Sequence, residues 1–174
     1  MRRRLEVLAP YNGAMSFVHL RTHTEFSVVD GTLRIRDAVA AARADSQVAC
    51  AITDLCNLFG TVKFYSACRA AGIKPVIGCD IWLEPEGGDK HGSRLLLLVQ
   101  DDAGYLNLCE LLARAWTGNT LRTQALIKWA WLDELGGGLL ALSGADGGAV
   151  GQALLGGDSA RAEQLAQRLA QLFP

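Results

Sequence analysis

The first apolar segment of the chain reads Phe17-Val-His-Leu-Arg-Thr-His-Thr-Glu-Phe-Ser-Val-Val-Asp-Gly31. Its opening residues predict a β-strand over 17–20, and alternation by two places His19, Arg21 and His23 on one face of the extended chain. A His-x-His pair on a strand is typical of a metal site, because both imidazoles reach one ion from the same side. A second His-x-His pair would place histidines at positions 21 and 23, but position 21 is Arg21. A guanidinium is a permanent cation that cannot bind a metal ion. The segment therefore has the form of a metal site that lacks one of its ligands.

The rest of the chain alternates short aliphatic runs with amphipathic stretches, which predicts an α/β fold. The strands are apolar on both faces, so we expect parallel strands joined by crossover helices, in a sheet that is covered on both sides or rolled into a barrel. Five strands are fewer than the roughly eight of a closed parallel barrel, so we expect only part of one. The predicted strands are 17–20, 48–53, 74–78, 95–99 and 138–142, and the predicted helices are 35–44, 60–71, 103–116, 127–135, 148–155 and 159–172.

Composition narrows the classes of function. The chain has 174 residues, 17 Lys+Arg and 18 Asp+Glu, so it is long enough for one domain and carries no net charge that would attract nucleic acid or a membrane. Its longest apolar run, Leu95 to Val99, is far shorter than the roughly 20 residues of a membrane span. The five cysteines form no C-x-x-C pair, which favours reduced, buried thiols and a cytoplasmic location.

The N-terminal residues 1–14 are expected to be a disordered extension. Three arginines precede a short apolar stretch, but Glu6 and Pro10 interrupt it, so it does not match a secretory signal. Met15 is an alternative start. We expect residues 15–174 to form one incomplete domain, because the last helix runs into Leu172-Phe-Pro174 with no following strand.

Several spaced motifs resemble one known family. The chain is similar to the N-terminal PHP (polymerase and histidinol phosphatase) domain of the bacterial replicative DNA polymerase III alpha subunit. Motifs that occur in the same order carry more information than a single short pattern. They are 19–31, Ala51-Ile-Thr-Asp-Leu-Cys-Asn-Leu-Phe-Gly60, Val62-Lys-Phe-Tyr65, Ala71-Gly-Ile-Lys-Pro-Val-Ile-Gly-Cys-Asp80, Asp101-Asp-Ala-Gly-Tyr-Leu-Asn-Leu108 and Leu140-Ala-Leu-Ser-Gly144.

The resemblance also implies which residues would hold metal ions. In PHP domains with an intact site, histidines and carboxylates at the strand ends bind several metal ions for phosphoester hydrolysis. The metal-ligand positions that this chain keeps are His23, Asp30 and Asp80, the last in place of the family's longer glutamate. The positions that it has lost, where the family has His or Cys, are Arg21, Leu55, Arg94 and Ala145.

These changes predict a site without metal and without hydrolytic activity. Two or three divalent cations need many donor atoms, and a nearby guanidinium repels them. We expect instead that Arg21 or Arg94 forms ion pairs with Asp30 or Asp80. We therefore expect no catalytic residue and no cofactor in this chain, although the full-length family polymerase uses Mg²⁺.

Three residues near the motifs have simpler interpretations. We expect His19 to be a hydrogen-bonded structural histidine, since its neighbours are apolar. We expect His91, in a turn-rich loop, to be solvated. Asp54 either accepts backbone N–H groups in the turn after its strand or belongs to the remnant site.

The resemblance implies a part of a DNA-directed DNA polymerase (a nucleotidyltransferase) that takes part in DNA replication. The polymerase catalytic region is absent, so we expect a non-catalytic scaffold that docks the proofreading exonuclease subunit of the polymerase III core. Contact with DNA would occur only through the missing region, because no basic stripe interleaved with aromatic residues is present, and no membrane partner is expected. The alternatives are a metal-dependent PHP phosphoesterase, which would require His at positions 21 and 55, and a non-functional gene fragment.

Overall fold

The computed structural model describes residues 17–86 and 91–173. The predicted disordered extension, residues 1–14, lies outside this range. In chain order the elements are α1 (Ile35–Ala44), β1 (Ala49–Ile52), α2 (Thr61–Ala71), β2 (Lys74–Leu83), β3 (Ser93–Val99), α3 (Asp102–Gly118), β4 (Thr120–Leu121), β5 (Gln124–Ile127), α4 (Trp129–Leu135), β6 (Leu139–Leu142), the short 3₁₀ turn η1 (Ala145–Gly147), α5 (Ala149–Leu155) and α6 (Ser159–Leu172).

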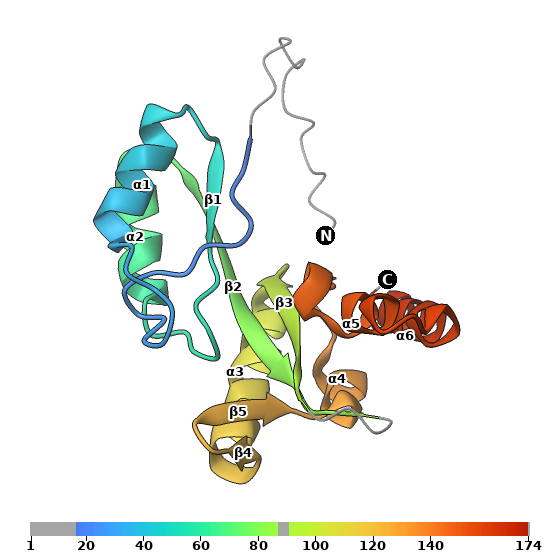
Figure 1. The fold of residues 1–174 in the computed structure, drawn as a ribbon. Coiled ribbons are helices and arrows are strands. Elements are labelled where there is room, and N and C mark those ends of the chain that lie inside the picture. The colour runs from blue at the N-terminus through green and yellow to red at the C-terminus, as the bar shows by residue number, and fades with distance from the viewer. Residues whose placement is uncertain (1–16, 87–90, 174) are drawn as a thin grey trace, which may run out of the picture.

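The α/β fold class is confirmed. The described strands form one sheet in the order β4-β5-β2-β3-β6, with β1 paired along the first half of β2. The β1–β2 and β2–β5 pairs are parallel, and α2 makes the crossover between β1 and β2, as expected. Figure 1 shows α1 and α2 stacked against β1, with the longer strand β2 running through the middle of the molecule.

Strand β3 runs antiparallel to both of its neighbours, β2 and β6. The sequence cadence predicted parallel strands throughout, but residues 84–92 are too few for a crossover connection, which takes about a dozen residues or more. The chain therefore turns back on itself as a hairpin. The short strands β4 and β5 were missed, because only three apolar residues in 124–127 carry the signal. For the same reason the predicted helix over 127–135 begins too early: Ile127 ends β5 and α4 starts at Trp129.

The predicted strand over 17–20 is wrong in a specific way. The segment runs beside β1, and the carbonyl oxygens of His19 and Thr22 accept hydrogen bonds from the backbone N–H groups of Ala51 and Thr53, at 2.8 and 2.9 Å. The donors are two residues apart and the acceptors three, so the two chains do not keep the even register of a ladder. The segment is therefore extended and held to β1, but it is not a strand.

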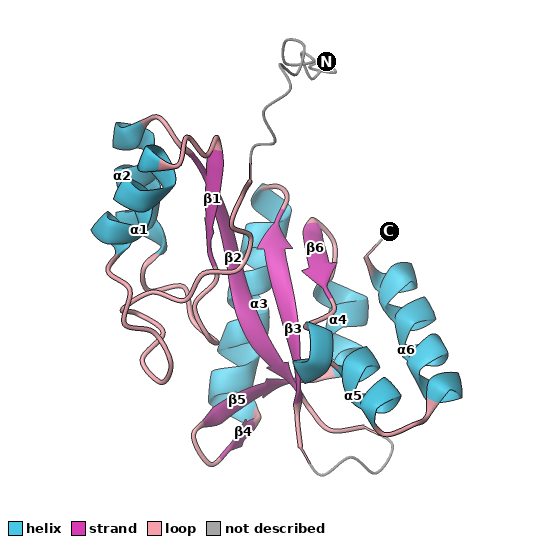
Figure 2. Cartoon of the chain, turned by 45° about the horizontal axis from the view of Figure 1, so that its top comes forward, coloured by secondary structure: helices cyan, strands magenta, loops and turns pink. Residues whose placement is uncertain are grey.

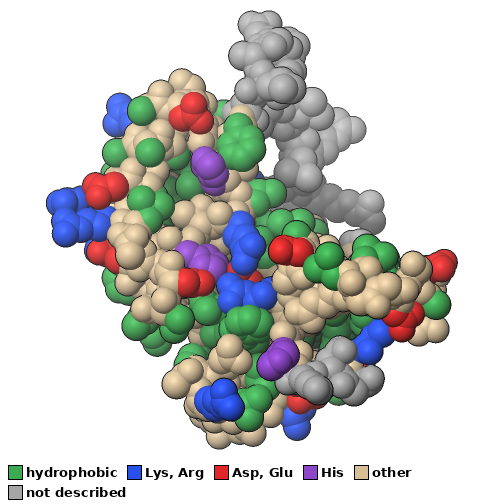
Figure 3. Space-filling model, viewed as in Figure 1, with side chains coloured by type: hydrophobic (Ala, Val, Ile, Leu, Met, Phe, Trp, Pro, Cys, Tyr) green, Lys and Arg blue, Asp and Glu red, His purple; other side chains and the backbone are tan. Residues whose placement is uncertain are grey.

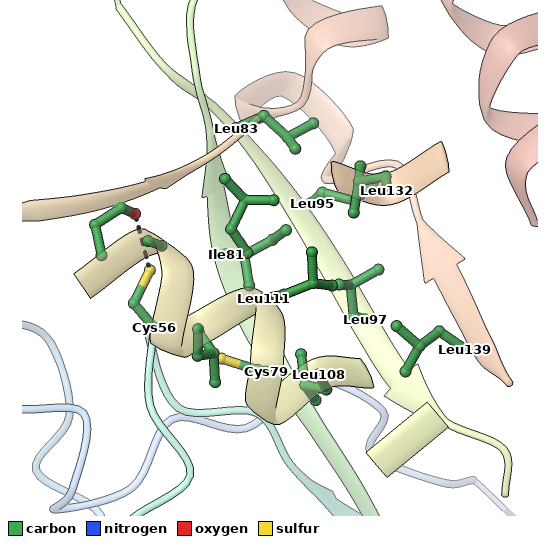
Figure 4. Close-up of a cluster of buried hydrophobic side chains, with 14 of the residues drawn as sticks. Cys56, Cys79, Ile81, Leu83, Leu95, Leu97, Leu108, Leu111, Leu132 and Leu139 are labelled. Carbon is green, nitrogen blue, oxygen red and sulfur yellow. Dashed lines mark hydrogen bonds between the residues drawn. The ribbon is translucent and has the colours of Figure 1, made fainter. Parts of the chain in front are cut away.

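Strand β2 is longer than the sequence predicted. Its side chains alternate between the two faces of the sheet, so that one face contributes to the core and the other to the candidate site. Cys79, Ile81 and Leu83 point to one face and are at most 1% exposed. On that face they pack with residues of β3 and α3, as Figure 4 shows for Ile81, Leu97 and Leu111. Successive side chains of a strand point to opposite faces, so Gly78, Asp80 and Trp82 lie on the other side of the sheet. The predicted strand stopped at Gly78, two residues before Asp80.

The face that carries Asp80 is only partly covered. Figure 2 shows α3 behind β2 and β3, whereas α5 and α6 lie to one side of the sheet. On β6, Leu140 and Leu142 point away from the core and remain 43% and 42% exposed. Among residues 17–86 and 91–173, no helix combines the length and the apolar character needed to cross a bilayer.

Candidate functional site

Asp80 lies at the centre of the candidate site. Its side chain is 1% exposed, and it accepts hydrogen bonds from two arginines and one histidine. Arg21 approaches the Oδ2 atom through Nη2 at 2.6 Å and through Nε at 2.9 Å. Arg94 makes a two-point contact, with Nε at 3.1 Å from Oδ1 and Nη2 at 2.8 Å from Oδ2. The predicted ion pairs are therefore present, and Arg21 and Arg94 both pair with the buried carboxylate of Asp80.

Arg94 is held from two further sides. It lies on β3 directly opposite Trp82 of β2, and its guanidinium carbon is 4.6 Å from the centre of the Trp82 ring. The turn that contains η1 packs against it: a Cβ added to Gly147 would lie 3.5 Å from Arg94 Cγ. Because of these contacts the Arg94 side chain is only 11% exposed. Stacking on an aromatic ring and a two-point carboxylate contact together suit the planar guanidinium.

His23 bridges the two carboxylates of the site. Its Nε2 atom is 3.1 Å from Asp80 Oδ2 and its Nδ1 atom is 3.0 Å from Asp30 Oδ2. An imidazole with a carboxylate at each nitrogen is satisfied only when both nitrogens carry a proton. The hydrogen bond to Asp80 accordingly raises the pKa of His23 above its usual value, although burial works against the charged form.

Asp80 is ionised in this environment. Burial by itself would raise the pKa of the carboxyl group, but the hydrogen bonds from His23, Arg94 and Arg21 outweigh it and hold the pKa at about 2. The cluster thus contains two carboxylates, Asp30 and Asp80, two guanidinium groups and the imidazole of His23, whose pKa is raised. Protein side chains therefore surround Asp80, at positions where the resemblance to PHP domains implies metal ligands.

The loop that carries His23 is fixed by Asp54. This buried carboxylate accepts hydrogen bonds from the Thr24 backbone N–H at 2.5 Å and from the Thr24 hydroxyl at 2.9 Å. Its burial raises its pKa despite these bonds. Asp54 therefore does accept a backbone N–H, but from Thr24 in the loop before β1 and not from the turn after its own strand, where it was expected. A Cβ on Gly31 would collide with the Thr24 carbonyl, so the loop can close only with glycine at that position.

The structure brings together most of the residues that the sequence singled out. The backbone of Leu55 forms an isolated parallel β-bridge with that of Asp80, and the Leu55 N–H donates to the Ser27 hydroxyl at 2.9 Å. Ser27 in turn donates to Asp30 at 2.6 Å. Ala145 lies in η1, in the turn beside Arg94, and is exposed.

His19 is not part of this group. Its ring is exposed and packs edge-on against Phe17 at 4.7 Å between centroids, so the expectation of a hydrogen-bonded histidine in an apolar setting is not met. Sequence reasoning missed Trp82, whose only signal was its place two residues after Asp80.

The residues present do not fit a metal ion. Asp80 Oδ2, the most buried oxygen of the site, already has nitrogens of Arg21, Arg94 and His23 within 3.1 Å. A divalent cation there would lie against two guanidinium groups, and neither can release its proton to become a donor. The described residues also contain no group of three His, Cys, Asp or Glu side chains placed to hold a metal ion. The expectation of no metal remains a prediction, to be tested on the purified protein.

Comparison with known proteins gives this site its context. The model of the PHP domain family matches residues 19–174. The chain belongs to the PHP domain family. It is 44% identical to the DNA polymerase III subunit alpha of Pseudomonas aeruginosa over 160 residues, which cover 92% of this chain and 14% of that protein. It is 43% and 38% identical to the subunits of the same name from Neisseria meningitidis and Escherichia coli K12, over 91% of this chain in each case.

This PHP chain therefore spans about 14% of the length of the curated relatives it matches. The matching region of the relatives is the N-terminal one. An amidohydrolase from Chromobacterium violaceum is similar in structure, with a TM-score of 0.47 and 22% sequence identity over 58% of this chain and 34% of that one.

Replacing the central carboxylate tests whether the ion pairs hold the site. Asp80→Asn leaves the Arg94 guanidinium buried without its counter-charge, and breaking a buried pair in this way costs about 3 kcal/mol. We expect urea denaturation to show a decrease of that size in the free energy of unfolding. The exposed Asp133→Asn on α4 is the matched control and should change it by less than about 0.5 kcal/mol. Equal effects of the two substitutions would contradict the central role of Asp80.

The His23 bridge makes stability depend on pH. The folded-state pKa of His23 lies above the unfolded value of 6.5, so the contribution of the imidazolium is fully present below pH 6.5 and is lost as pH rises through the folded-state pKa. We expect the free energy of unfolding to fall on the alkaline side of pH 6.5, and His23→Gln to reduce this slope. The exposed His91→Gln should keep it. A slope that survives in His23→Gln would exclude the bridge as its source.

Proposed function

We propose that this chain is the PHP portion of a replicative DNA polymerase III alpha subunit, and that it acts there as a non-catalytic scaffold that docks the proofreading exonuclease subunit. Its similarity to alpha subunits over 91–92% of its length supports the first part. The cluster around Asp80 supports the second, because it holds protein cations where PHP hydrolases hold metal ions. DNA would meet the complete protein through its polymerase region, which would also carry the Mg²⁺ chemistry and the nucleotidyl transfer.

The Asp80 cluster explains how a scaffold can keep the shape of a hydrolase site. Metal ions held by the ligands that the resemblance implies would tie the loop after residue 20 to strands β2 and β3. Here Arg21 and His23 make the link from the loop, and Arg94 makes it from β3, all to the same carboxylate. The loops therefore keep fixed positions without metal ions. A rigid surface is what a docking partner requires, since less ordering has to be paid for on binding.

Metal content gives a direct test of the loss of hydrolysis. We expect the purified chain, dialysed after exposure to Zn²⁺ or Mn²⁺, to contain substoichiometric metal by plasma mass spectrometry and to leave a generic phosphate ester intact. The variant with Arg21→His, Leu55→His, Arg94→His and Ala145→Cys restores donor atoms at the lost positions. It should retain metal, with circular dichroism used to check its fold. Stoichiometric metal in the unmodified chain that His23→Gln abolishes would contradict the proposal.

A group of exposed apolar residues offers a first place to look for the docking contact. Val28 and Val29 are 82% and 83% exposed, and Phe59 and Val62 are 75% and 77% exposed. The two segments that carry them are joined, because Asn57 donates to the Phe26 carbonyl and Lys63 pairs with Glu25. Exposed apolar side chains on neighbouring segments are typical of protein-binding surfaces.

Co-elution with the exonuclease tests the docking role. We expect the full chain to co-elute in gel filtration with the proofreading exonuclease subunit of a polymerase III core, such as the one from P. aeruginosa. The double variant Val28→Asp, Val62→Asp should weaken co-elution if these residues make the contact. Leu155→Asp, at an exposed leucine of α5, is the control and should not. Separate elution of the unmodified chain would argue against docking and for the gene-fragment alternative.

A further inference from the structure

The outer face of α2 carries apolar side chains that the rest of the described chain leaves uncovered. Phe64 and Cys68, one turn apart, point into the core and are fully buried. Val62 and Tyr65 lie on the other side of the helix and remain 77% and 51% exposed. A helix that packs against the core on one side normally carries polar residues on the other. The exposed stripe therefore departs from the pattern that contact with water favours.

A cation lies at the end of this stripe. Arg69 is in the last turn of α2, at a helical spacing that places it on the same face as Val62 and Tyr65. Its side chain is exposed, and within residues 17–86 and 91–173 it forms no ion pair. A cation in the last turn interacts favourably with the helix dipole. That interaction leaves the N–H donors of the guanidinium free for a carboxylate of a partner.

The helices α1 and α2 together form a positively charged layer. Their cations are Arg36, Arg43, Lys63 and Arg69, and Asp37 is the one carboxylate that Ile35–Ala44 and Thr61–Ala71 contain. Figure 3 shows Lys and Arg side chains along the left edge of the molecule, where Figure 1 places α1 and α2. A surface with a surplus of cations is complementary to an acidic partner.

The exposed surface continues from the start of α2 into the neighbouring loop. Phe59, just before the helix, and Val28, in the loop, are both highly exposed. A Cβ added to Gly60 would lie 3.1 Å from the Phe26 ring, so the loop that carries Val28 reaches the start of the helix. The surface is therefore apolar at its loop end and along α2, and it ends in the positive charge of Arg69.

We infer that the outer face of α2 binds an amphipathic, acidic segment of a partner protein, with apolar side chains on Val62 and Tyr65 and a carboxylate on Arg69. This inference rests on the proposed docking role and names the surface and the chemistry of the contact. Tyrosine and arginine are the residue types that most often dominate the energy of an interface. The ion pair fixes the direction of the bound segment, because the free guanidinium lies at one end of the stripe.

Titration calorimetry of the full chain with the proofreading exonuclease subunit of P. aeruginosa tests this inference. Tyr65→Ala and Arg69→Glu should each weaken binding about tenfold or more, the first by loss of apolar contact and the second by repulsion of the carboxylate. Arg69→Gln should weaken it less, and its affinity should depend less on salt than that of the unmodified chain. Arg122→Glu, at an exposed arginine in the β4–β5 turn, is the control and should leave the affinity unchanged.

The outcomes separate this inference from the docking role itself. An unmodified chain that does not bind the exonuclease would overturn both. Binding that Tyr65→Ala and Arg69→Glu leave unchanged would overturn the inference alone, since the exonuclease would then contact another surface. Equal weakening by Arg122→Glu and Arg69→Glu would show a general effect of charge and would also overturn it. Circular dichroism should show that each variant keeps the fold, because all three side chains are exposed.

Discussion

The structure of the site depends on the burial of one charge. Asp80 is placed inside the sheet by the alternation of β2, at a position where its carboxylate is almost fully excluded from water. A buried carboxylate must be paired or neutralised, since leaving it charged and alone costs several kcal/mol. Three cationic groups meet this need, and each belongs to a different part of the chain: the segment before the loop, the loop itself and β3. The pairing therefore fixes the relative positions of these parts.

Arginine at positions 21 and 94, where the resemblance to PHP domains implies histidine, satisfies the same constraint. A metal ion and a guanidinium both supply positive charge to a buried carboxylate, but the guanidinium is permanently attached to the chain and is always charged. Losing metal ligands without gaining cations would have left Asp80 uncompensated. In this chain, the arginines at positions 21 and 94 supply that counter-charge directly, and we propose that they do so in place of metal ions.

The surrounding polar residues act mainly on geometry. Asp54 holds Thr24, Ser27 connects Leu55 to Asp30, and glycine at position 31 lets the loop close over itself. None of these contacts supplies a nucleophile or a base. They position His23 between its two carboxylates, which is consistent with the structural role that we propose for the site.

The sequence by itself determined the α/β class, most helices to within a residue or two, the family and the residues that meet at Asp80. Local periodicity and ordered motifs carry that information, and α1 and α6 begin and end where their spacing predicts. Only the tertiary structure decided the antiparallel direction of β3, the extension of β2 through Asp80 and the choice of Asp80 over Asp30 as the shared partner of both arginines. These features depend on strand pairing and burial, which bring together residues 59 and 14 positions apart in the chain. No local pattern encodes which of two carboxylates will be shielded from water.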